Sequence, residues 1–285
     1  MKVDVCTWTK NGSKTLIPVL KRIDSVIPSE EAGEKIAVDD SSVDDTVNIL
    51  KDFNWKVYPN HSGFINGGTT EALQHVRSKF FVSVEQDVLL GRDWWDIVPR
   101  NMDDKTVAVA QGVEISTNRA ERGIDNYNLK KIKKMPLEKR AMLWKTIGNN
   151  IYRSEIIKKL GFVDDATHMT PFYRKITGSG FKWITDVNAI STHLHGDIFD
   201  AVRHTVTFYN LTQEKTYLDR MSTSRYLAGL AFSPLKGMKM ALATNEPEVQ
   251  LLFILRKMAL TPTFFQRKQR RRHNLKKNKN DKVVN

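Results

Sequence analysis

The sequence has very little cysteine and no long apolar run. Cys6 is the only cysteine among 285 residues, which excludes a disulfide framework and any cysteine-rich metal site. No stretch of about 18 uninterrupted apolar residues occurs, so we expect no membrane-spanning helix. The first residues, MKVDVCTW, do not form a cleavable signal pattern. These absences fit a reducing compartment, and we expect a cytoplasmic protein that is peripheral on the cytoplasmic face of the membrane.

Acidic residues are outnumbered, and the excess of basic residues is concentrated at one end. The chain has 45 Lys and Arg against 32 Asp and Glu, a formal net charge of +13. Such a balance suggests an anionic partner: nucleic acid, an acidic membrane surface or a phosphorylated substrate. Residues 267–282 alone contain nine Lys and Arg and one acid, Asp281. Because a folded nucleic-acid-binding surface would spread its cations over a domain, nucleic acid is not the expected partner.

The first half of the chain alternates strand and helix patterns. The predicted strands cover 3–8, 34–40, 56–60 and 80–87, and the predicted helices cover 13–27, 42–53 and 66–77. Spacing of this kind predicts an α/β fold with a mostly parallel sheet and helices on both faces.

Three of the predicted strands end in polar or acidic clusters: Thr7–Asn11, Asp39–Ser42 and Glu85–Asp87. In open parallel sheets, ligands bind outside the carboxyl ends of the strands, so these clusters should meet at one edge. The third cluster lies within the apolar run FFVSVEQDVLL (80–90), where unpaired buried carboxylates are costly. It is therefore a solvated strand end, a salt-bridged pair or a cation site.

The middle of the chain is less regular. Residues 115–142 are polar and basic with little apolar periodicity, which predicts a mobile loop or an insertion that covers a site. Residues 151–165 suggest a helix followed by a turn, and a further helix should start near Thr170–Pro171. A last strand within 181–197 ends in His193-Leu194-His195, where alternate side chains share a face and resemble a metal site.

The last third changes character. Two apolar segments, 226–242 and 249–265, are too short to span a membrane and are interrupted by Lys236, Lys239, Arg256 and Lys257. They fit helices lying in a membrane interface, or a helical pair packed on the core. The predicted organisation is a domain over 1–205, a helical extension over 206–265 and a disordered polybasic tail over 266–285. The tail is either a solubilising end or a contact to an anionic leaflet, worth about 1 kcal/mol per nearby cation.

Over roughly residues 1–200 the chain resembles family-2 glycosyltransferases of the GT-A fold. The resemblance is carried by VDVCTWTKN (3–11), AVDDSSVDDT (37–46), NGGTTEAL (66–73) and VEQDVLLGRDWW (84–95). It implies a Rossmann-like, mostly parallel mixed sheet and sugar transfer from a UDP- or GDP-sugar with Mn²⁺ or Mg²⁺, with inversion. The acceptor would be a hydroxyl or a lipid phosphate, such as a polyprenyl phosphate or a lipid-linked glycan at the cytoplasmic membrane face.

The resemblance also assigns the nucleoside contacts. Asp40, with Asp39 as the weaker candidate, would hydrogen-bond the nucleobase, and Thr7 would contact the same nucleoside. Glu85 and Gln86 stand in the family's D-x-D motif, where Glu85 would face the ribose or sugar. For Asp39 and Asp40, the alternative from the sequence alone is a strand-end turn.

The remaining assignments concern the diphosphate. Asp87 would ligate the divalent cation, and His195, or else His193, would complete its shell. Oxygen-coordinated Mg²⁺ or Mn²⁺ suits a departing diphosphate. Arg203 is a candidate for clamping the diphosphate, with a solvated helix position as its alternative.

The chain departs from the family where members carry a Glu-Asp pair before a helix. The matching stretch is ATHMTPFYRK (166–175), with Thr167 and His168 in place of the pair. His168 is a candidate base, since its unperturbed pKa near 6.5 suits proton abstraction. Asp165, or Asp164, is the alternative. The chain could otherwise be a catalytically weak nucleotide-sugar-binding protein or a basic-tailed nucleic-acid-binding scaffold.

Overall fold

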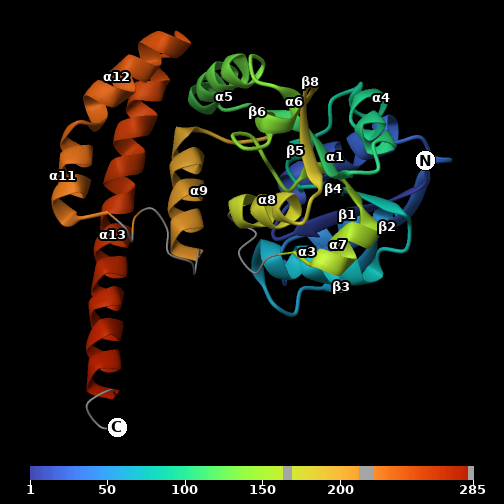
Figure 1. The fold of residues 1–285 in the computed structure, drawn as a ribbon, viewed down its shortest axis with the longest axis horizontal. Coiled ribbons are helices and arrows are strands. Elements are labelled where there is room, and N and C mark those ends of the chain that lie inside the picture. Colours follow the sequence, from blue (N-terminus) through green and yellow to red (C-terminus); the bar gives the residue numbers. More distant parts are fainter. Residues whose placement is uncertain (163–168, 212–217, 219–220, 282–285) are drawn as a thin grey trace. The chain divides into compact units, whose positions relative to one another are not determined.

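The computed structural model describes residues 1–162, 169–211, 218 and 221–281 (Figure 1). Within these ranges, no helix combines the length and apolar content that crossing a bilayer requires. The chain divides into two compact units. Unit 1 comprises residues 1–117 and 125–195, and unit 2 comprises residues 118–124 and 196–285.

Unit 1 is built on one mixed sheet of eight strands in the order β3-β2-β1-β4-β7-β6-β8-β5. The strands are β1 (Val3–Thr9), β2 (Ala32–Asp39), β3 (Lys56–Pro59), β4 (Phe80–Val84), β5 (Val88–Leu89), β6 (Val107–Ser116), β7 (Asn149–Arg153) and β8 (Lys182–His193). Strands β3, β2, β1 and β4 are parallel, as are β6 and β8. Strand β7 is antiparallel to both its neighbours, and β5 is antiparallel to β8. The predicted mostly parallel sheet is confirmed.

Helices cover both faces of this sheet because alternate strand residues point to opposite sides. Val3 and Val5 of β1 pack with α1 (Ser13–Val26), α2 (Thr46–Asp52) and α4 (Trp94–Ile97). Cys6 and Trp8 pack with α3 (Phe64–His75), α7 (Ser154–Leu160) and α8 (Met169–Gly178) on the other face. The expected α/β architecture is therefore confirmed.

The segment 115–142, expected to be a mobile loop or an insertion, is not an irregular loop. It forms α5 (Arg119–Ile132) and the short α6 (Leu137–Arg140). Leu129 and Ile132 are buried with Val113 of β6 and Val187 of β8. This tertiary packing stabilises a helix whose sequence is mostly polar, and it cannot be deduced from local periodicity.

Unit 2 contains α9 (Ile198–Leu211), α11 (Thr223–Ala231), α12 (Ser233–Thr244) and α13 (Glu248–Asp281). Helices α11 to α13 cover the two segments predicted to be helical. The backbone of α13 continues to Asp281, so most of the predicted disordered tail is helical. Helix α9 already belongs to unit 2, which places the boundary ahead of the expected residue 205.

A buried carboxylate joins three parallel strands at their amino ends. Asp4 of β1 accepts hydrogen bonds from the backbone N–H groups of Arg77 (2.6 Å), Ser78 (2.8 Å) and Glu34 (3.0 Å). It also accepts one from the Ser78 hydroxyl at 2.8 Å. Burial by itself would raise the pKa of Asp4, but these hydrogen bonds to the ionised form outweigh it and lower the pKa.

We expect Asp4→Asn to destabilise the protein by about 1–3 kcal/mol, because an amide leaves buried N–H donors without acceptors. The folded-state pKa of Asp4 is depressed, so its contribution is present above the unfolded-state pKa and is lost as the pH falls through the folded-state pKa. The difference from wild type in denaturant titrations should shrink below about pH 4.

The matched control is Asp52→Asn, which removes the same charge from an exposed position on α2. A similar stability loss in both variants would show that net charge, rather than the Asp4 hydrogen bonds, is responsible.

Candidate active site

The loop after β1 joins the carboxyl ends of β2 and β4. The Lys10 N–H donates to Gln86 Oε1 at 2.9 Å, and Gln86 Nε2 donates to the Lys10 carbonyl at 3.2 Å. The Lys10 ammonium contacts Asp40 Oδ2 at 2.9 Å. A Cβ atom at position 12 would collide with the end of the Gln86 side chain, so a larger residue there would displace Gln86 from its hydrogen bonds to Lys10. The three polar strand ends therefore meet at one edge of the sheet.

The two adjacent acids at the end of β2 lie in different environments. Asp39 is buried and accepts hydrogen bonds from Thr9 Oγ1 (2.9 Å), Ser42 N (2.8 Å) and Ser42 Oγ (2.6 Å). These bonds fix the turn that follows the strand. Asp40 is partly exposed and contacts the Lys10 ammonium. Asp39 thus shapes the turn, and Asp40 presents its carboxylate at the edge.

Thr7 of β1 is more deeply buried than Asp39 and Asp40, the predicted nucleoside contacts at the carboxyl end of β2. Its side chain is 1% exposed, and its hydroxyl has no hydrogen-bond partner among the described residues. Its neighbours Cys6 and Trp8 pack on the opposite face of the sheet, so Thr7 lies on the side covered by α1.

Asp87, His193 and His195 converge beyond the ends of β4 and β8. One ligand atom from each residue lies within 4.8 Å of the other two. His193 Nε2 is 3.4 Å from Asp87 Oδ1 and 3.0 Å from His195 Nε2. The backbone holds this arrangement: Leu194 N–H donates to the Asp87 carbonyl at 2.8 Å, and Thr117 N–H donates to the His193 carbonyl at 2.8 Å. The two expected ligands, Asp87 and His195, are brought together, with His193 between them.

Glu114 of β6 is a neighbour of this group that the sequence did not identify. It is 7% exposed, and its Oε2 lies 3.6 Å from His193 Nδ1. Its other oxygen, Oε1, has no hydrogen-bond partner among the described residues. The signal in the sequence was a carboxylate inside the apolar strand VAVAQGVEIS (107–116), which has the same form as the Glu85–Asp87 anomaly.

The side chain of Glu85 is directed into the protein and lies against Gly148. Its N–H donates to the Gly148 carbonyl at 3.2 Å, and its side chain occupies the space where a Cβ atom of residue 148 would lie. Burial raises the pKa of Glu85, and the charges of Glu114 and Asp87 raise it further. A glycine at position 148 is therefore needed for Glu85 to adopt this position.

His193 is the group whose pKa responds to all three neighbouring carboxylates. Burial would lower its pKa, but the hydrogen bond and charge of Asp87, followed by the charges of Glu114 and Glu85, raise the pKa to about 10. Burial also raises the pKa of Glu114, and the charge on His193 partly offsets this. The surroundings of His193 are thus strongly negative and favour a cation.

The donor set fits a divalent cation. One carboxylate oxygen and two imidazole nitrogens are ligands that Mn²⁺ accepts, and Mg²⁺ prefers a larger share of oxygen. Glu114 Oε2 lies 3.6 Å from Nδ1 of His193, and its negative charge there would favour a proton on Nδ1, which leaves Nε2 available as a ligand.

Three further predicted residues are not part of the described cluster. Asp165 and His168 lie outside the described residues. Arg203 lies on α9 of unit 2, where it is exposed and forms an ion pair with Asp200 at 2.5 Å.

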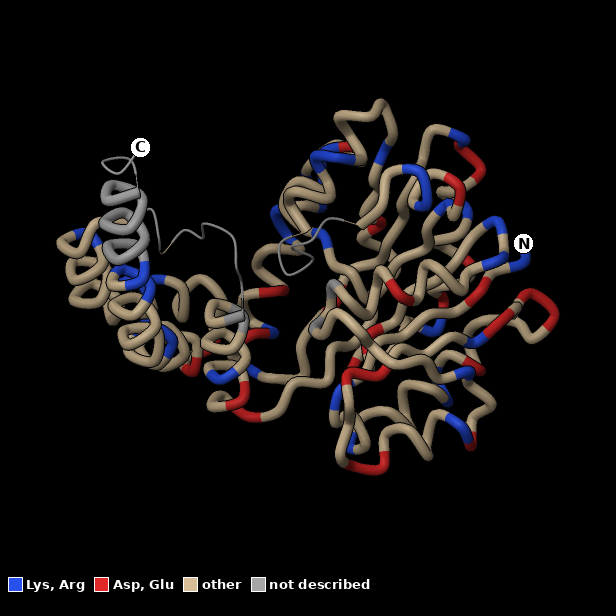
Figure 2. The backbone as a smooth tube through the Cα atoms, turned by 90° about the horizontal axis from the view of Figure 1, so that it is seen from below, with Lys and Arg blue, Asp and Glu red and all other residues tan. Residues whose placement is uncertain are grey.

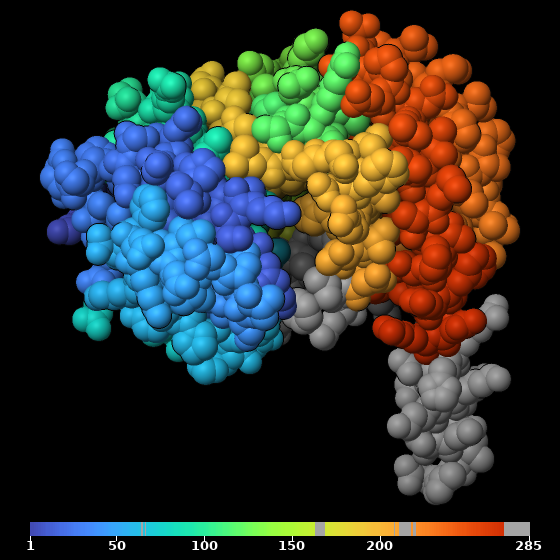
Figure 3. Space-filling view, turned by 180° about the vertical axis from the view of Figure 1, so that it is seen from behind, coloured from blue at the N-terminus to red at the C-terminus, as the bar shows by residue number. Residues whose placement is uncertain are grey.

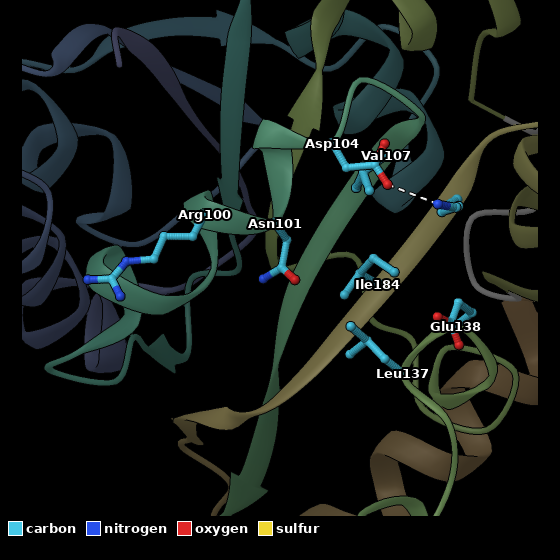
Figure 4. A pocket seen from close by; sticks show the side chains of 8 residues that line it. Arg100, Asn101, Asp104, Val107, Leu137, Glu138 and Ile184 are labelled. Carbon is cyan, nitrogen blue, oxygen red and sulfur yellow. Dashed lines mark hydrogen bonds and ion pairs between the residues drawn. The ribbon is translucent and has the colours of Figure 1, made fainter.

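A separate cavity of about 190 Å³ lies at the amino ends of β6 and β8, at the opposite end of these strands from Glu114 and His193 (Figure 4). Asp104 and Lys182 form an ion pair of 2.9 Å across it, and Leu137 and Ile184 supply apolar walls. None of the predicted site residues lines this cavity. We therefore place the candidate active site at the carboxyl edge.

Several solved structures share this fold at low sequence identity. A mannosyltransferase from Pyrobaculum calidifontis, solved with GDP-Man and Mn²⁺, is 16% identical with a TM-score of 0.57, covering 90% of this chain and 86% of that one. TarS residues 1–349 from S. aureus, solved with UDP, is 14% identical with a TM-score of 0.51, covering 91% and 89%. Glucosyl-3-phosphoglycerate synthase from Mycobacterium tuberculosis, solved with Mn²⁺, UDP-glucose and glycerol 3-phosphate, is 12% identical with a TM-score of 0.51, covering 74% and 78%. At these identities the likeness establishes the fold alone.

A search of curated proteins by sequence found no match. The model of glycosyl transferase family 2, in contrast, matches residues 4–161, which is more than half of the chain. The matched stretch contains the edge formed by Asp40, Gln86 and Asp87. The chain therefore belongs to glycosyl transferase family 2.

Proposed function

We propose that this chain transfers a sugar from a UDP- or GDP-sugar to an acceptor, using Mn²⁺ or Mg²⁺ held by Asp87, His193 and His195. One observation carries the proposal. Asp40 and the Asp87–His193–His195 group lie at the same sheet edge, and Lys10 contacts both Asp40 and Gln86. Lys10 would thereby keep the proposed nucleoside contact, Asp40, at a fixed position relative to the proposed diphosphate site at Asp87.

The solved relatives support this assignment. Their bound ligands include GDP-Man with Mn²⁺, UDP, and UDP-glucose with Mn²⁺. Both nucleotides occur among them, so they do not discriminate between UDP and GDP for this chain.

The chemistry of the site agrees with the proposal. Sugar transfer expels a nucleoside diphosphate, and a bound divalent cation would stabilise the negative charge on that leaving group. Asp87, His193 and His195 would hold the cation, and Glu114 would orient His193. Asp40 would orient the nucleoside, while the Lys10–Gln86 hydrogen bonds keep the two halves of the site at a fixed separation.

The expected stereochemical outcome is inversion. An acceptor hydroxyl then needs a base, for which we propose His168 with Asp165 as the alternative. A lipid phosphate acceptor, such as a polyprenyl phosphate, is already ionised near neutral pH and needs no base. The missing Glu-Asp pair is compatible with either class of acceptor.

The first test is nucleotide binding. At a hundredfold excess over its Kd, UDP or GDP with Mn²⁺ should stabilise the protein by about 2.7 kcal/mol in thermal unfolding. EDTA should abolish the metal-dependent part of this stabilisation. Asp87→Asn should abolish the same part and leave the metal-independent part unchanged.

The control is Asp96→Asn, an exposed acid on α4, which should behave as wild type. If neither nucleotide stabilises the protein, the proposal fails, and salt-sensitive binding of nucleic acid would then favour the scaffold alternative. Binding without donor turnover would instead identify a catalytically weak nucleotide-sugar-binding protein.

Glu114→Gln should weaken Mn²⁺ binding about 10- to 100-fold, because the amide no longer supplies the charge that orients His193. Isothermal titration with Mn²⁺ in the presence of UDP or GDP measures this loss, and nucleotide binding in EDTA should be unchanged. Unaltered Mn²⁺ affinity would show that Glu114 has no role in the cation site.

His168→Ala should lower kcat by about 100-fold or more with an unchanged donor Kd, as expected for loss of a general base. The parallel variant Asp165→Asn separates the two candidates. Retention of full activity by both variants would exclude a base at either position and favour a phosphate acceptor. The anomeric configuration of the product, followed by NMR, tests inversion in the same reactions.

A further inference from the structure

Helix α12 exposes a stripe of apolar side chains. Leu235, Met238 and Leu242 recur at intervals of three and four residues, which places them on one side of the helix. Leu235 is 56% exposed and Leu242 is 79% exposed. Gly237 lies off this side of α12 and is buried against α13. The stripe is therefore not used in packing α12 onto its neighbour.

Helix α13 has a second such stripe. Leu251, Met258 and Phe265 are exposed at seven-residue intervals, with the half-buried Leu255 between the first two. The other side of the helix buries Val249, Leu252, Leu260 and Phe264, which pack with residues of α9 and α11. Helix α13 is thus apolar on two opposite sides, and only one of them is covered within unit 2.

The two stripes belong to adjacent helices. Residues 245–247 connect α12 to α13, and a Cβ atom on Gly237 would lie 2.9 Å from the Gln250 backbone. The helices run side by side in the ribbon and space-filling views (Figures 1 and 3). We call the side chains of Leu235, Met238, Leu242, Leu251, Met258 and Phe265 the α12–α13 face.

Unit 2 also carries most of the net positive charge of the chain. It contains 19 Lys and Arg against 8 Asp and Glu, whereas unit 1 is close to neutral with 26 against 24. Lys236 and Lys239 are exposed on α12, beside the stripe, and Arg270 is exposed on α13. Figure 2 shows the basic residues of these helices in blue. Cations are therefore placed close to the exposed apolar side chains.

We propose that the α12–α13 face docks unit 2 onto an anionic lipid bilayer, with both helices lying in the interface. Apolar side chains would enter the headgroup and acyl boundary, while lysines contact anionic headgroups. The described helices cannot span a bilayer, which agrees with an interfacial position. The proposal concerns a partner beyond the sugar-transfer reaction and does not depend on it.

Charge and composition favour a bilayer over other occupants. Nucleic acid would satisfy the cations but would leave the Leu and Met side chains in water, where contiguous apolar patches are uncommon on monomers. A second copy of the chain would bring two strongly positive units together. An anionic bilayer satisfies both the apolar and the basic components.

The test is flotation of the full chain with vesicles of phosphatidylcholine alone or of phosphatidylcholine mixed with anionic phosphatidylglycerol. The wild type should bind the anionic vesicles, with weaker binding at 0.5 M salt because the electrostatic part is screened, roughly as the Debye length falls below 8 Å. The neutral triple variant Leu235→Gln, Leu242→Gln, Met258→Gln should reduce partitioning at least about tenfold.

The matched control is Ile17→Gln, an exposed apolar side chain on α1 of unit 1, which should bind as wild type. Lys236→Gln with Lys239→Gln should reduce binding to anionic vesicles and leave binding to neutral ones unchanged. Absence of wild-type binding, or wild-type binding by the triple variant, would overturn the proposal. So would a shift from dimer to monomer on sedimentation caused by the triple variant, which would identify a second copy as the occupant.

Discussion

The crowding of carboxylates around His193 is the constraint on which the site depends. Asp87, Glu114 and Glu85 all act on this one imidazole and raise its pKa to about 10. Removing so much negative charge from water is costly unless a positive charge compensates it. His193 can supply a proton for that purpose, and a divalent cation at the same position would supply two charges. The fold keeps the acids together by joining the strand ends, through Leu194 to Asp87 and Thr117 to His193.

The two edges of the sheet use buried acids in opposite ways. At the amino edge, Asp4 is fully supplied with donors from Glu34, Arg77 and Ser78, and its pKa is lowered. At the carboxyl edge, Glu114 has an oxygen without a described partner, and its pKa is raised. The first arrangement stabilises the fold. The second leaves a carboxylate oxygen of Glu114 available to accept a further contact, which is the pattern expected of functional sites.

Much of the sheet could be predicted because its strands have strong local patterns. The runs EKIAVDD (34–40) and FFVSVEQD (80–87) placed Asp40 and Asp87 at strand ends, and parallel topology then brought those ends to one edge. Glu114 escaped prediction because β6 pairs with β7 and β8, which are distant in sequence. Helix α5 escaped because Leu129 and Ile132 gain their packing partners only from β6 and β8. Both omissions arise because the packing partners are distant in sequence, and local periodicity carries no information about such partners.

Separation of charge between the units suggests why one chain combines them. Under the proposed function, unit 1 would bind an anionic nucleotide. Its 26 cations and 24 acids nearly cancel, so the attraction would come from a local cation cluster or a bound metal rather than from a broad positive field. Unit 2 carries the broad positive field. Its exposed apolar stripes on α12 and α13 would have no apolar surface to pack against if the ligand were a nucleotide. A surface that is both basic and apolar matches a lipid interface. With the positive charge on unit 2, the chain would concentrate at an anionic membrane through that unit. The metal site in unit 1 would then not attract other anions non-specifically.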